Sequence, residues 1–398
     1  MDRTLPDSKA FGVLLRLPKA IVEKKWNLIS SKLTSYLFFV NLSLHDETTK
    51  PIIRSQEGSI TLTRYIVRRL FAMPFLILGI VTLAFLLTTV VKGDPLSAIV
   101  SERQMNNPDI VAAAKARWGL DKPLPERYVI YVTNLLKGDM GTSFITRRPV
   151  TQDLMYRLPA TMELVIAAML VGTVMGISLG VLAAYFRGTA IDHVARLIAL
   201  FGSSVPVFWL GLALIYVTSV HWHFLPGPGR VDARAALPPT ITGFIIIDSL
   251  LSGDFRLFAD ALRHLILPAF VLGWSVAGTI SRLVRANMLE VMSREFILTA
   301  RAKGAGEFRV VMHHALRNTM VPTLTVIGYS FAYLLTGAVL TETIFSWPGM
   351  GSYAVQAARG LDFPAIIGVT IVGGSMFLLT NLLTDIAYVV ANPRVRLS

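Results

Sequence analysis

Residues 164–186 of this chain read LVIAAMLVGTVMGISLGVLAAYF, which is 23 consecutive residues without Asp, Glu, Lys, Arg or His. A helix needs about 20 apolar residues to cross the hydrocarbon core of a bilayer, so this stretch is long enough to span one. Inside lipid the backbone polar groups must be paired within the spanning structure, which leaves helices and closed β-barrels as the two solutions. The stretch lacks the apolar–polar alternation of barrel strands. It therefore predicts a membrane-spanning helix.

Five other windows of the chain are equally free of ionisable residues. They cover residues 70–91, 197–220, 265–281, 319–341 and 363–384, and only 265–281, with 17 residues, is short for a span. The whole chain is 53% hydrophobic and 16% charged, whereas a soluble domain carries about 25% charged residues. The sequence thus predicts an all-α integral membrane protein with six transmembrane helices. It argues against a soluble globule and excludes a disordered chain or a β-barrel.

The formal net charge of +13 first suggests a nucleic-acid-binding protein, but the positions of the cations favour a membrane surface. Basic residues crowd the short connections 187–196 and 282–317, precede the first window and follow the last. With six crossings these segments share one side, and basic connections stay in the cytoplasm, so both termini are predicted to be cytoplasmic. The partner implied by the charge is the anionic inner leaflet and not nucleic acid.

The chain divides into an extension and a membrane domain. Residues 1–60 hold 9 Lys plus Arg and 6 Asp plus Glu, and are expected to form a cytoplasmic N-terminal extension with a possible interfacial amphipathic helix. Residues 61–396 are expected to form the transmembrane domain. Within it we expect an outer cap at 92–160, an outer insertion at 222–264 and a cytoplasmic loop at 290–318.

Catalytic motifs are absent from the sequence. It contains no GxxxxGK[ST] loop for nucleotide phosphates, no HExxH zinc motif and no cysteine. The run His221-Trp222-His223 is more typical of an interface anchor than of a metal site. We therefore expect no catalytic residue, no metal site and no cofactor bound by this chain.

Polar residues within the windows are candidates for a path through the membrane, although such residues also serve helix packing. The candidates are Ser203, Ser204, Tyr329, Ser330 and Asn381. The windows lack a central Asp, Glu or Lys to relay protons, which disfavours a proton-coupled carrier. The alternatives left open are such a carrier or a channel and, in a different class, an intramembrane enzyme or a structural subunit.

The most informative stretch is 295–306, EFILTARAKGAG, which is followed by HALRN at 314–318 and by Pro322. Its glycines permit a sharp turn, and its cations suit docking to another protein. The run ARAKG at 300–304, with HALRN downstream, resembles the "EAA loop" of bacterial ABC importer permeases. It is most similar to the permeases of the dipeptide, oligopeptide and nickel family.

The resemblance covers about residues 63–396. Further segments that are similar to this family are RYIVRRL at 64–70, GDP at 93–95, GLDKP at 119–123, GDMG at 138–141, RLPATMEL at 157–164, HLILP at 264–268 and ETIFSWPGMG at 342–351. Lys92, Leu361 and the first 60 residues depart from the family pattern.

The resemblance implies a type I-like ABC importer permease bundle in the bacterial cytoplasmic (inner) membrane. The implied partners are a second homologous permease subunit, two cytoplasmic ABC ATPases that use ATP and Mg, and an extracytoplasmic solute-binding protein. The implied cargo is di- or oligopeptides, with nickel chelates or another small solute as the alternative.

The resemblance also implies two sets of site residues. Those expected to couple to the ATPase, with both arginines pairing to carboxylates, are Ala300, Arg301, Lys303, Gly304, Ala305, Phe308 and Arg309. Those expected to face the binding protein are Glu342, Trp347 and Gly349.

The placement of the basic residues yields a topological prediction. Reporter domains fused after Gly138 and after Gly304 are expected to report opposite sides of the membrane, because three spans separate these positions. Activity of both fusions on the same side would contradict the six-span topology.

Overall fold

The structure is a computed structural model that describes residues 62–90, 106–118 and 122–391. Contacts divide the chain into residues 1–59 and residues 60–398, and only the second unit is described below. The N-terminal extension expected at residues 1–60 and parts of the expected outer cap lie outside the described residues.

The described residues are helical apart from their connections and one isolated β-bridge between Thr142 and Pro149. The long helices are α2 (Leu62–Val90), α6 (Val150–Tyr185), α7 (Ala190–Ser204), α10 (Phe255–Met292), α13 (Leu316–Gly337) and α16 (Phe363–Ala391). Short helices join them: α4 (Pro108–Trp118), α5 (Leu124–Leu136), α8 (Val207–Ile215), α9 (Ile245–Leu251), α11 (Glu295–Ala302), α12 (Glu307–Arg309), α14 (Val339–Ile344) and α15 (Met350–Arg359). Two π-helices, η2 (Tyr216–His221) and η3 (Val310–Ala315), complete the fold.

Among the described residues, the helices α2, α6, α10 and α16 are long and apolar enough to cross a membrane. The expected 17-residue window 265–281 lies inside α10, which has 38 residues, so the helix continues well beyond the uncharged stretch. The expected span 197–220 is instead broken into α7 and a helix over Val207–His221, which meet at 103°. Counting this bent pair as one span gives five candidates.

Proline explains the break between α7 and α8. Pro206 has no N–H to donate to the preceding turn, and its ring disfavours the helical conformation for the residue before it. Val205 is accordingly extended, with φ −78° and ψ 127°, and ends α7. The window at 197–220 is uniformly apolar, so its hydropathy alone gave no sign of this bend.

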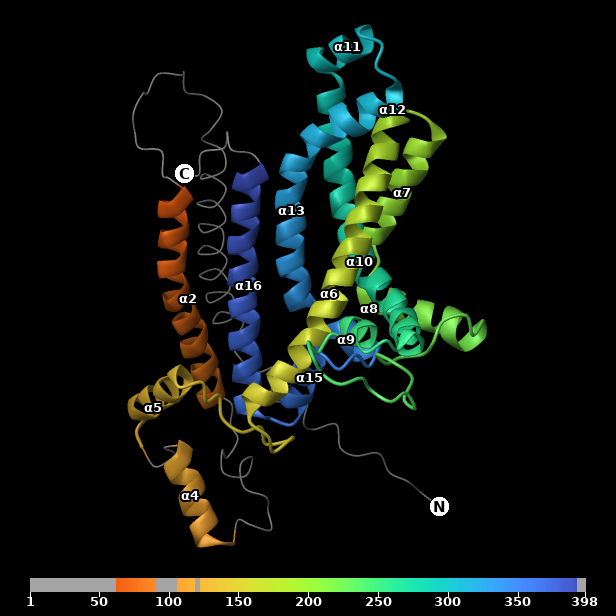
Figure 1. The fold of residues 1–398 in the computed structure, drawn as a ribbon. Helices are drawn as coiled ribbons and strands as arrows, with labels where there is room; N and C mark the ends of the chain where they lie inside the picture. The colour runs from red at the N-terminus through yellow and green to blue at the C-terminus, as the bar shows by residue number, and fades with distance from the viewer. Residues whose placement is uncertain (1–61, 91–105, 119–121, 392–398) are drawn as a thin grey trace, which may run out of the picture. The chain divides into compact units, whose positions relative to one another are not determined.

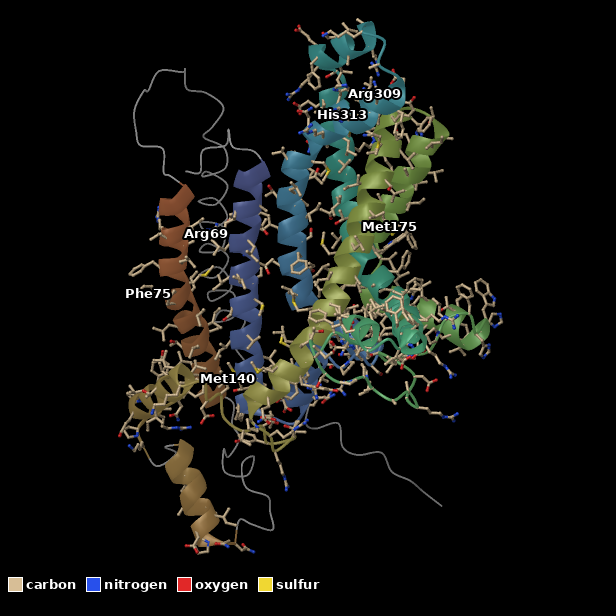
Figure 2. All side chains as sticks on the ribbon, viewed as in Figure 1. Arg69, Phe75, Met140, Met175, Arg309 and His313 are labelled. Carbon is tan, nitrogen blue, oxygen red and sulfur yellow. The ribbon has the colours of Figure 1, made fainter. Side chains whose placement is uncertain are left out.

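The helices of the second unit form a row of neighbours that runs from α2 through α16 and α13 to α6 and α10 (Figure 1). An ion pair between Arg69 and Asp385 joins α2 to α16. The opposite surface of α2 carries exposed aromatic side chains such as Phe75 (Figure 2), which suits contact with lipid. α11 and α12 lie at one end of the long helices, while α9 and α15 lie at the other (Figure 1).

α6 and α10 form the most extensive helix pair in the described structure, and glycines allow their backbones to touch. A Cβ atom added at Gly172 would lie 2.7 Å from the carbonyl oxygen of Gly273, and one added at Gly273 would lie 2.4 Å from that of Ala168. Small residues at helix contacts are the usual way to gain packing energy in membranes, where lipid competes for apolar surface. The core around this contact includes Leu164, Ile280 and Met288.

The close approach of α6 and α10 predicts a steric cost for Gly273→Ala. The added methyl group would force the two backbones apart, and such overpacking typically costs about 1–3 kcal/mol. We expect a lower thermal unfolding temperature of the detergent-solubilised protein. Gly79→Ala is the matched control, because a Cβ atom at that helical position of α2 meets nothing within 4 Å. Equal unfolding temperatures for the two variants would contradict this account of the contact.

Candidate functional site

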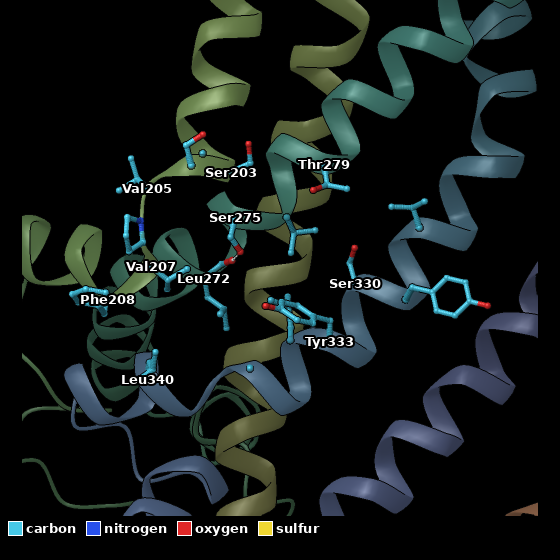
Figure 3. A pocket seen from close by; sticks show the side chains of 18 of the residues that line it. Ser203, Val205, Val207, Phe208, Leu272, Ser275, Thr279, Ser330, Tyr333 and Leu340 are labelled. Carbon is cyan, nitrogen blue, oxygen red and sulfur yellow. Dashed lines mark hydrogen bonds between the residues drawn. The ribbon is translucent and has the colours of Figure 1, made fainter. Parts of the chain in front are cut away.

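A cavity of about 840 Å³ opens where α7 gives way to α8, against the walls formed by α10 and α13 (Figure 3). Hydroxyl groups are frequent in its lining, which contains Ser203, Ser204, Ser275, Thr279, Tyr329, Ser330 and Tyr333. Apolar side chains such as Leu272 and Phe208 complete the wall. Arg282 is the single residue of the lining that is charged at neutral pH. The cavity therefore presents a mixed polar and apolar wall that is rich in hydrogen-bonding groups.

The bend at Pro206 creates this space. Before the bend α7 packs tightly on α10, since a Cβ atom at Gly202 would lie 2.8 Å from Nε1 of Trp274. A clamp at the start of α7 supports this packing: Arg285 of α10 donates two hydrogen bonds of 3.0 Å to the buried carboxylate of Asp192. After the bend α8 turns away from the direction of α7. A straight helix would instead have kept the direction of α7, and the cavity lies at the angle between the two helices.

The structure brings four of the five predicted path residues, Ser203, Ser204, Tyr329 and Ser330, to this one cavity. Asn381 is not part of its lining. It belongs to α16, which packs against α13 and α2, and its side-chain oxygen is buried without a hydrogen-bond partner among the described residues. The role of the four in a translocation path stays a prediction.

The sequence analysis missed the contribution of α10 to the cavity. Ser275, Thr279 and Arg282 follow the i, i+4, i+7 spacing that places residues on one helix face. That polar face could have been found in the sequence if the window had been extended beyond the uncharged stretch, because Arg282 lies one residue after its end.

The end of the long helices opposite α11 and α12 is held by buried carboxylates (Figure 1). Glu163 accepts hydrogen bonds from Nε and Nη2 of Arg230 at 2.8 and 2.6 Å and from the backbone N–H of Ile246 at 2.9 Å. Glu342 accepts from the hydroxyl of Thr161 at 2.7 Å. These contacts tie the predicted outer insertion and the α14–α15 loop to the N-terminal half of α6.

Glu342, Trp347 and Gly349 were expected to face a binding protein, but all three are buried. Trp347 donates from Nε1 to the carbonyl oxygen of Ala160 at 2.7 Å. A Cβ atom at Gly349 would lie 2.3 Å from the carboxylate of Glu342, so this glycine leaves room for the buried acid. The three residues hold the loop in shape, while Thr343 and Ser346 of the same loop are exposed.

The predicted coupling residues lie on α11, α12 and the turn between them. The turn depends on Gly304, whose φ of +80° is unfavourable for residues with a side chain. Ile297 is fully buried and anchors α11, whereas Leu298 and Phe308 are 69% and 81% exposed. The surface formed by α11, α12 and their turn is therefore anchored by a buried side chain and exposes apolar and positively charged side chains. Figure 2 shows Arg309 and His313 in this region.

The lysine and arginines of this surface differ in their pairing. Arg301 was expected to pair with a carboxylate, and the structure supplies one from the same loop, Glu307, at 2.8 Å. Lys303 and Arg309 are exposed. Ala305 closes the turn by donating its N–H to the carbonyl oxygen of Ala300 at 3.1 Å. Arg301 thus stabilises the turn itself.

Asp248 organises the outer insertion. It accepts hydrogen bonds from the hydroxyl and N–H of Thr242 at 2.7 and 2.8 Å and from the N–H groups of Gly243 and Ile241 at 2.9 and 3.3 Å. Burial by itself raises the pKa of this carboxyl, but the donors outweigh burial and hold the pKa below its usual value. The charged form of Asp248 is thus the form that orders this segment.

Metal chemistry finds no support in the part of the chain that the structure describes. Within it no group of three or more His, Cys, Asp or Glu side chains is placed to hold an ion. His221 and His223 are both exposed.

Comparisons with known proteins agree with this description of a membrane component. Residues 176–397 match the family model described as "Binding-protein-dependent transport system inner membrane component", and residues 62–165 match the corresponding N-terminal model.

Three relatives are similar to this protein over most of the chain. The dipeptide transport system permease protein DppB of Escherichia coli K12 is 43% identical over 84% of this chain and 98% of its own length. The di/tripeptide permease DppB of Pseudomonas aeruginosa is 44% identical over 83% and 98%. The probable D,D-dipeptide permease DdpB of E. coli K12 is 40% identical over 82% and 96%.

The hydrogen bonds of Asp248 predict a pH-dependent order in the outer insertion. In Asp248→Asn the side-chain NH2 group replaces one of the two acceptor oxygens, so that a donor faces the backbone N–H donors. Backbone amides 241–243 should then exchange with deuterium roughly tenfold faster, which corresponds to losing about one hydrogen bond to a charged group.

The native carboxyl has the lower pKa, so its stabilisation is present above the ordinary carboxyl pKa of about 3.9 and is lost as the pH falls below it. The difference between wild type and variant should therefore persist from pH 7 to pH 5 and shrink in stronger acid. Asp232→Asn, which changes an exposed acid of the same insertion, is the control. A difference that does not depend on pH would contradict the assignment.

Proposed function

This chain belongs to the family of binding-protein-dependent transport system inner membrane components, and from that membership we propose that it is a permease subunit through which an ATP-driven importer moves di- or oligopeptides into the cell. It is a transport subunit and not an enzyme. The solute would arrive from an extracytoplasmic binding protein, cross with the help of a second homologous permease, and be driven by two cytoplasmic ATPases that consume ATP and Mg.

The observation that carries the proposal is the cavity at the α7–α8 bend together with the coupling surface at the cytoplasmic end of its walls. The cavity is large enough for a small peptide, and its lining is rich in hydroxyl groups that can donate and accept hydrogen bonds. The chain has no phosphate-binding loop of its own, so the free energy must come from a partner. Similarity to three peptide permeases over more than four fifths of the chain supports peptides as the cargo.

We propose six spans with both termini in the cytoplasm, as the basic connections favour. α13 supplies the remaining span beside the four long helices and the bent α7–α8 pair. It is 22 residues long and packs between α16 and α10. In this topology α11 and α12 are cytoplasmic, while α9 and α15 belong to the outer face.

The connections between the coupling surface and the cavity are short and helical. α10 ends at Met292 and α11 begins at Glu295, while η3 runs directly into α13. Both walls of the cavity are thus attached to the surface that an ATPase would push. Closure of the ATPases moves this surface as a rigid body and shifts α10 and α13 against α7. The ATPases must bind one arrangement more tightly than the other, because equal binding shifts no equilibrium.

The outer cap and the outer insertion would receive the binding protein. Glu163 and Arg230 hold the insertion on α6, and Glu342 holds the α14–α15 loop there, so that docking on the outer face is transmitted to a helix that lies along α10 and contacts α13. The contact residues themselves would be exposed ones, because Glu342, Trp347 and Gly349 are buried.

The importer reconstituted in proteoliposomes with its partner subunits and binding protein tests the proposal. We expect uptake of labelled dipeptide that requires ATP and the binding protein. In Gly304→Asp a side chain in a left-handed turn and a negative charge would enter a basic docking surface, so uptake and stimulated ATPase activity should fall about tenfold while membrane abundance stays normal.

Gly138→Asp is the matched control for binding of the ATPases, since Gly138 has φ +82° and open surroundings but lies in the outer cap, away from the coupling surface. The Gly138→Asp importer should keep its ATPases bound on purification, whereas Gly304→Asp should weaken their binding. Uptake of a nickel chelate but not of dipeptide would favour the nickel alternative. Transport by this chain alone without ATP would favour a carrier, and hydrolytic activity of the isolated chain would favour an enzyme. A Gly304→Asp importer with wild-type uptake would contradict the coupling assignment.

A further inference from the structure

The wall of the 840 Å³ cavity contains one charge, the guanidinium of Arg282. Its Nη1 donates a hydrogen bond to the hydroxyl of Ser203 at 2.8 Å, and its Nη2 lies 3.4 Å from the hydroxyl of Thr279. Both acceptors are neutral. No described carboxylate forms an ion pair with Arg282, and its side chain is exposed in the chain described here.

The next arginine along the same helix shows the contrast. Arg285, less than one turn toward the cytoplasmic end of α10, donates two hydrogen bonds of 3.0 Å to the buried Asp192. Arg285 is thereby neutralised within the chain. Arg282 instead keeps its positive charge beside the cavity, surrounded by hydroxyl groups that can also donate to an anion.

A cation close to the membrane interior is costly, and such residues usually mark a pathway or pair with an opposite charge. A guanidinium presents its N–H donors as a planar fork that matches the two oxygens of a carboxylate. Ser203 and Thr279 hold this fork beside the cavity.

We propose that Arg282, together with the hydroxyls of Ser203 and Thr279, binds the carboxylate terminus of the solute during its passage through the cavity. The inference rests on the proposed function, because it takes a peptide as the solute. Every linear peptide has a terminal carboxylate whatever its side chains. A permease that accepts many sequences can therefore use this group for orientation without reading the rest of the peptide.

The site should bind weakly. Passage requires an affinity high enough for entry and low enough for release. The guanidinium is exposed and not enclosed by apolar residues, so water competes with the solute and the binding affinity stays low. A movement of α10 relative to α7 would separate Arg282 from Ser203 and help to release the anion.

The absence of cysteine from the native chain permits a direct test. Ser330 lies in the cavity lining on α13 and is replaced by cysteine as a reporter in the assembled importer. An anionic sulfonate and a cationic ammonium methanethiosulfonate are compared by their rates of modifying this chain, measured by mass. We expect the anionic-to-cationic rate ratio to fall about tenfold when Arg282→Gln is added, because the local field that attracts anions is lost.

Arg187→Gln provides the matched control, since Arg187 is an exposed arginine of the α6–α7 connection that does not line the cavity. It should leave the ratio unchanged. An unchanged ratio in Arg282→Gln would overturn the proposal, as would an equal fall in Arg187→Gln.

A second arm tests the ligand. A dipeptide with a free carboxylate should protect the Ser330→Cys reporter from a neutral thiol reagent, whereas the same dipeptide with a C-terminal amide should not. Arg282→Gln should abolish the protection, and Arg282→Lys, which keeps a charge without the fork, should retain part of it. Equal protection by the dipeptide and its amide would overturn the proposal.

Transport separates this inference from the function on which it rests. In Arg282→Gln we expect normal stimulation of ATPase activity by loaded binding protein but about tenfold lower uptake. If the wild-type importer moves no peptide, the proposed function fails, while the rate ratio still decides whether Arg282 attracts anions. If the wild-type importer moves peptide and Arg282→Gln does so equally well, the inference alone fails.

Discussion

Where α6 crosses α10 the two backbones meet directly, because Gly172 and Gly273 place no side chain between them. Helices in lipid gain little from burying apolar surface against each other, so close packing must supply the association energy. The other helices depend on this pair: α7 packs on both of its members, and α13 contacts both. The predicted outer insertion is bound to α6 through Glu163, and the predicted coupling loop begins directly after the C-terminal end of α10.

Ion pairs fix the positions of elements that the glycine contact does not reach. Arg69 and Asp385 join α2 to α16, Asp192 and Arg285 join α7 to α10, and Glu163 and Arg230 hold the insertion. A buried pair adds little net stability, but removing one partner strands the other charge and is strongly destabilising. The pairs made by Asp192 and Glu163, whose carboxylates are buried, are therefore costly to break by mutation of one partner. Arg282 has no such carboxylate partner among the described residues, and it lies beside the cavity at the α7–α8 bend.

The bend at Pro206 links the packing of α7 on α10 to the cavity. It lets the first half of the span remain clamped on α10 while the second half follows another direction, and the cavity occupies the divergence. The same α10 that forms the cavity wall continues to the coupling surface, whose turn depends on the positive φ of Gly304. Short helical connections therefore join that surface to α10 and α13, the two helices that form the walls of the cavity.

The sequence alone determined the helical class, the family and the positions of the long apolar helices α2, α6, α10 and α16, while the count of six spans and the coupling role of the turn at Gly304 stay predictions. Runs of apolar residues and local motifs are properties of contiguous residues, so the chain reveals them without its partners in space. Only the tertiary structure decided which polar residues meet. It brought Ser203, Ser204, Tyr329 and Ser330 to one cavity, left Asn381 outside it and added Arg282.

The tertiary structure also decided that Glu342, Trp347 and Gly349 are buried and that Arg301 pairs with Glu307. The physical reason is the same in each case. The rotation of a helix, and hence the direction of its polar residues, follows from contacts with helices that are distant in the sequence, and these contacts leave no periodic signal within a single apolar segment.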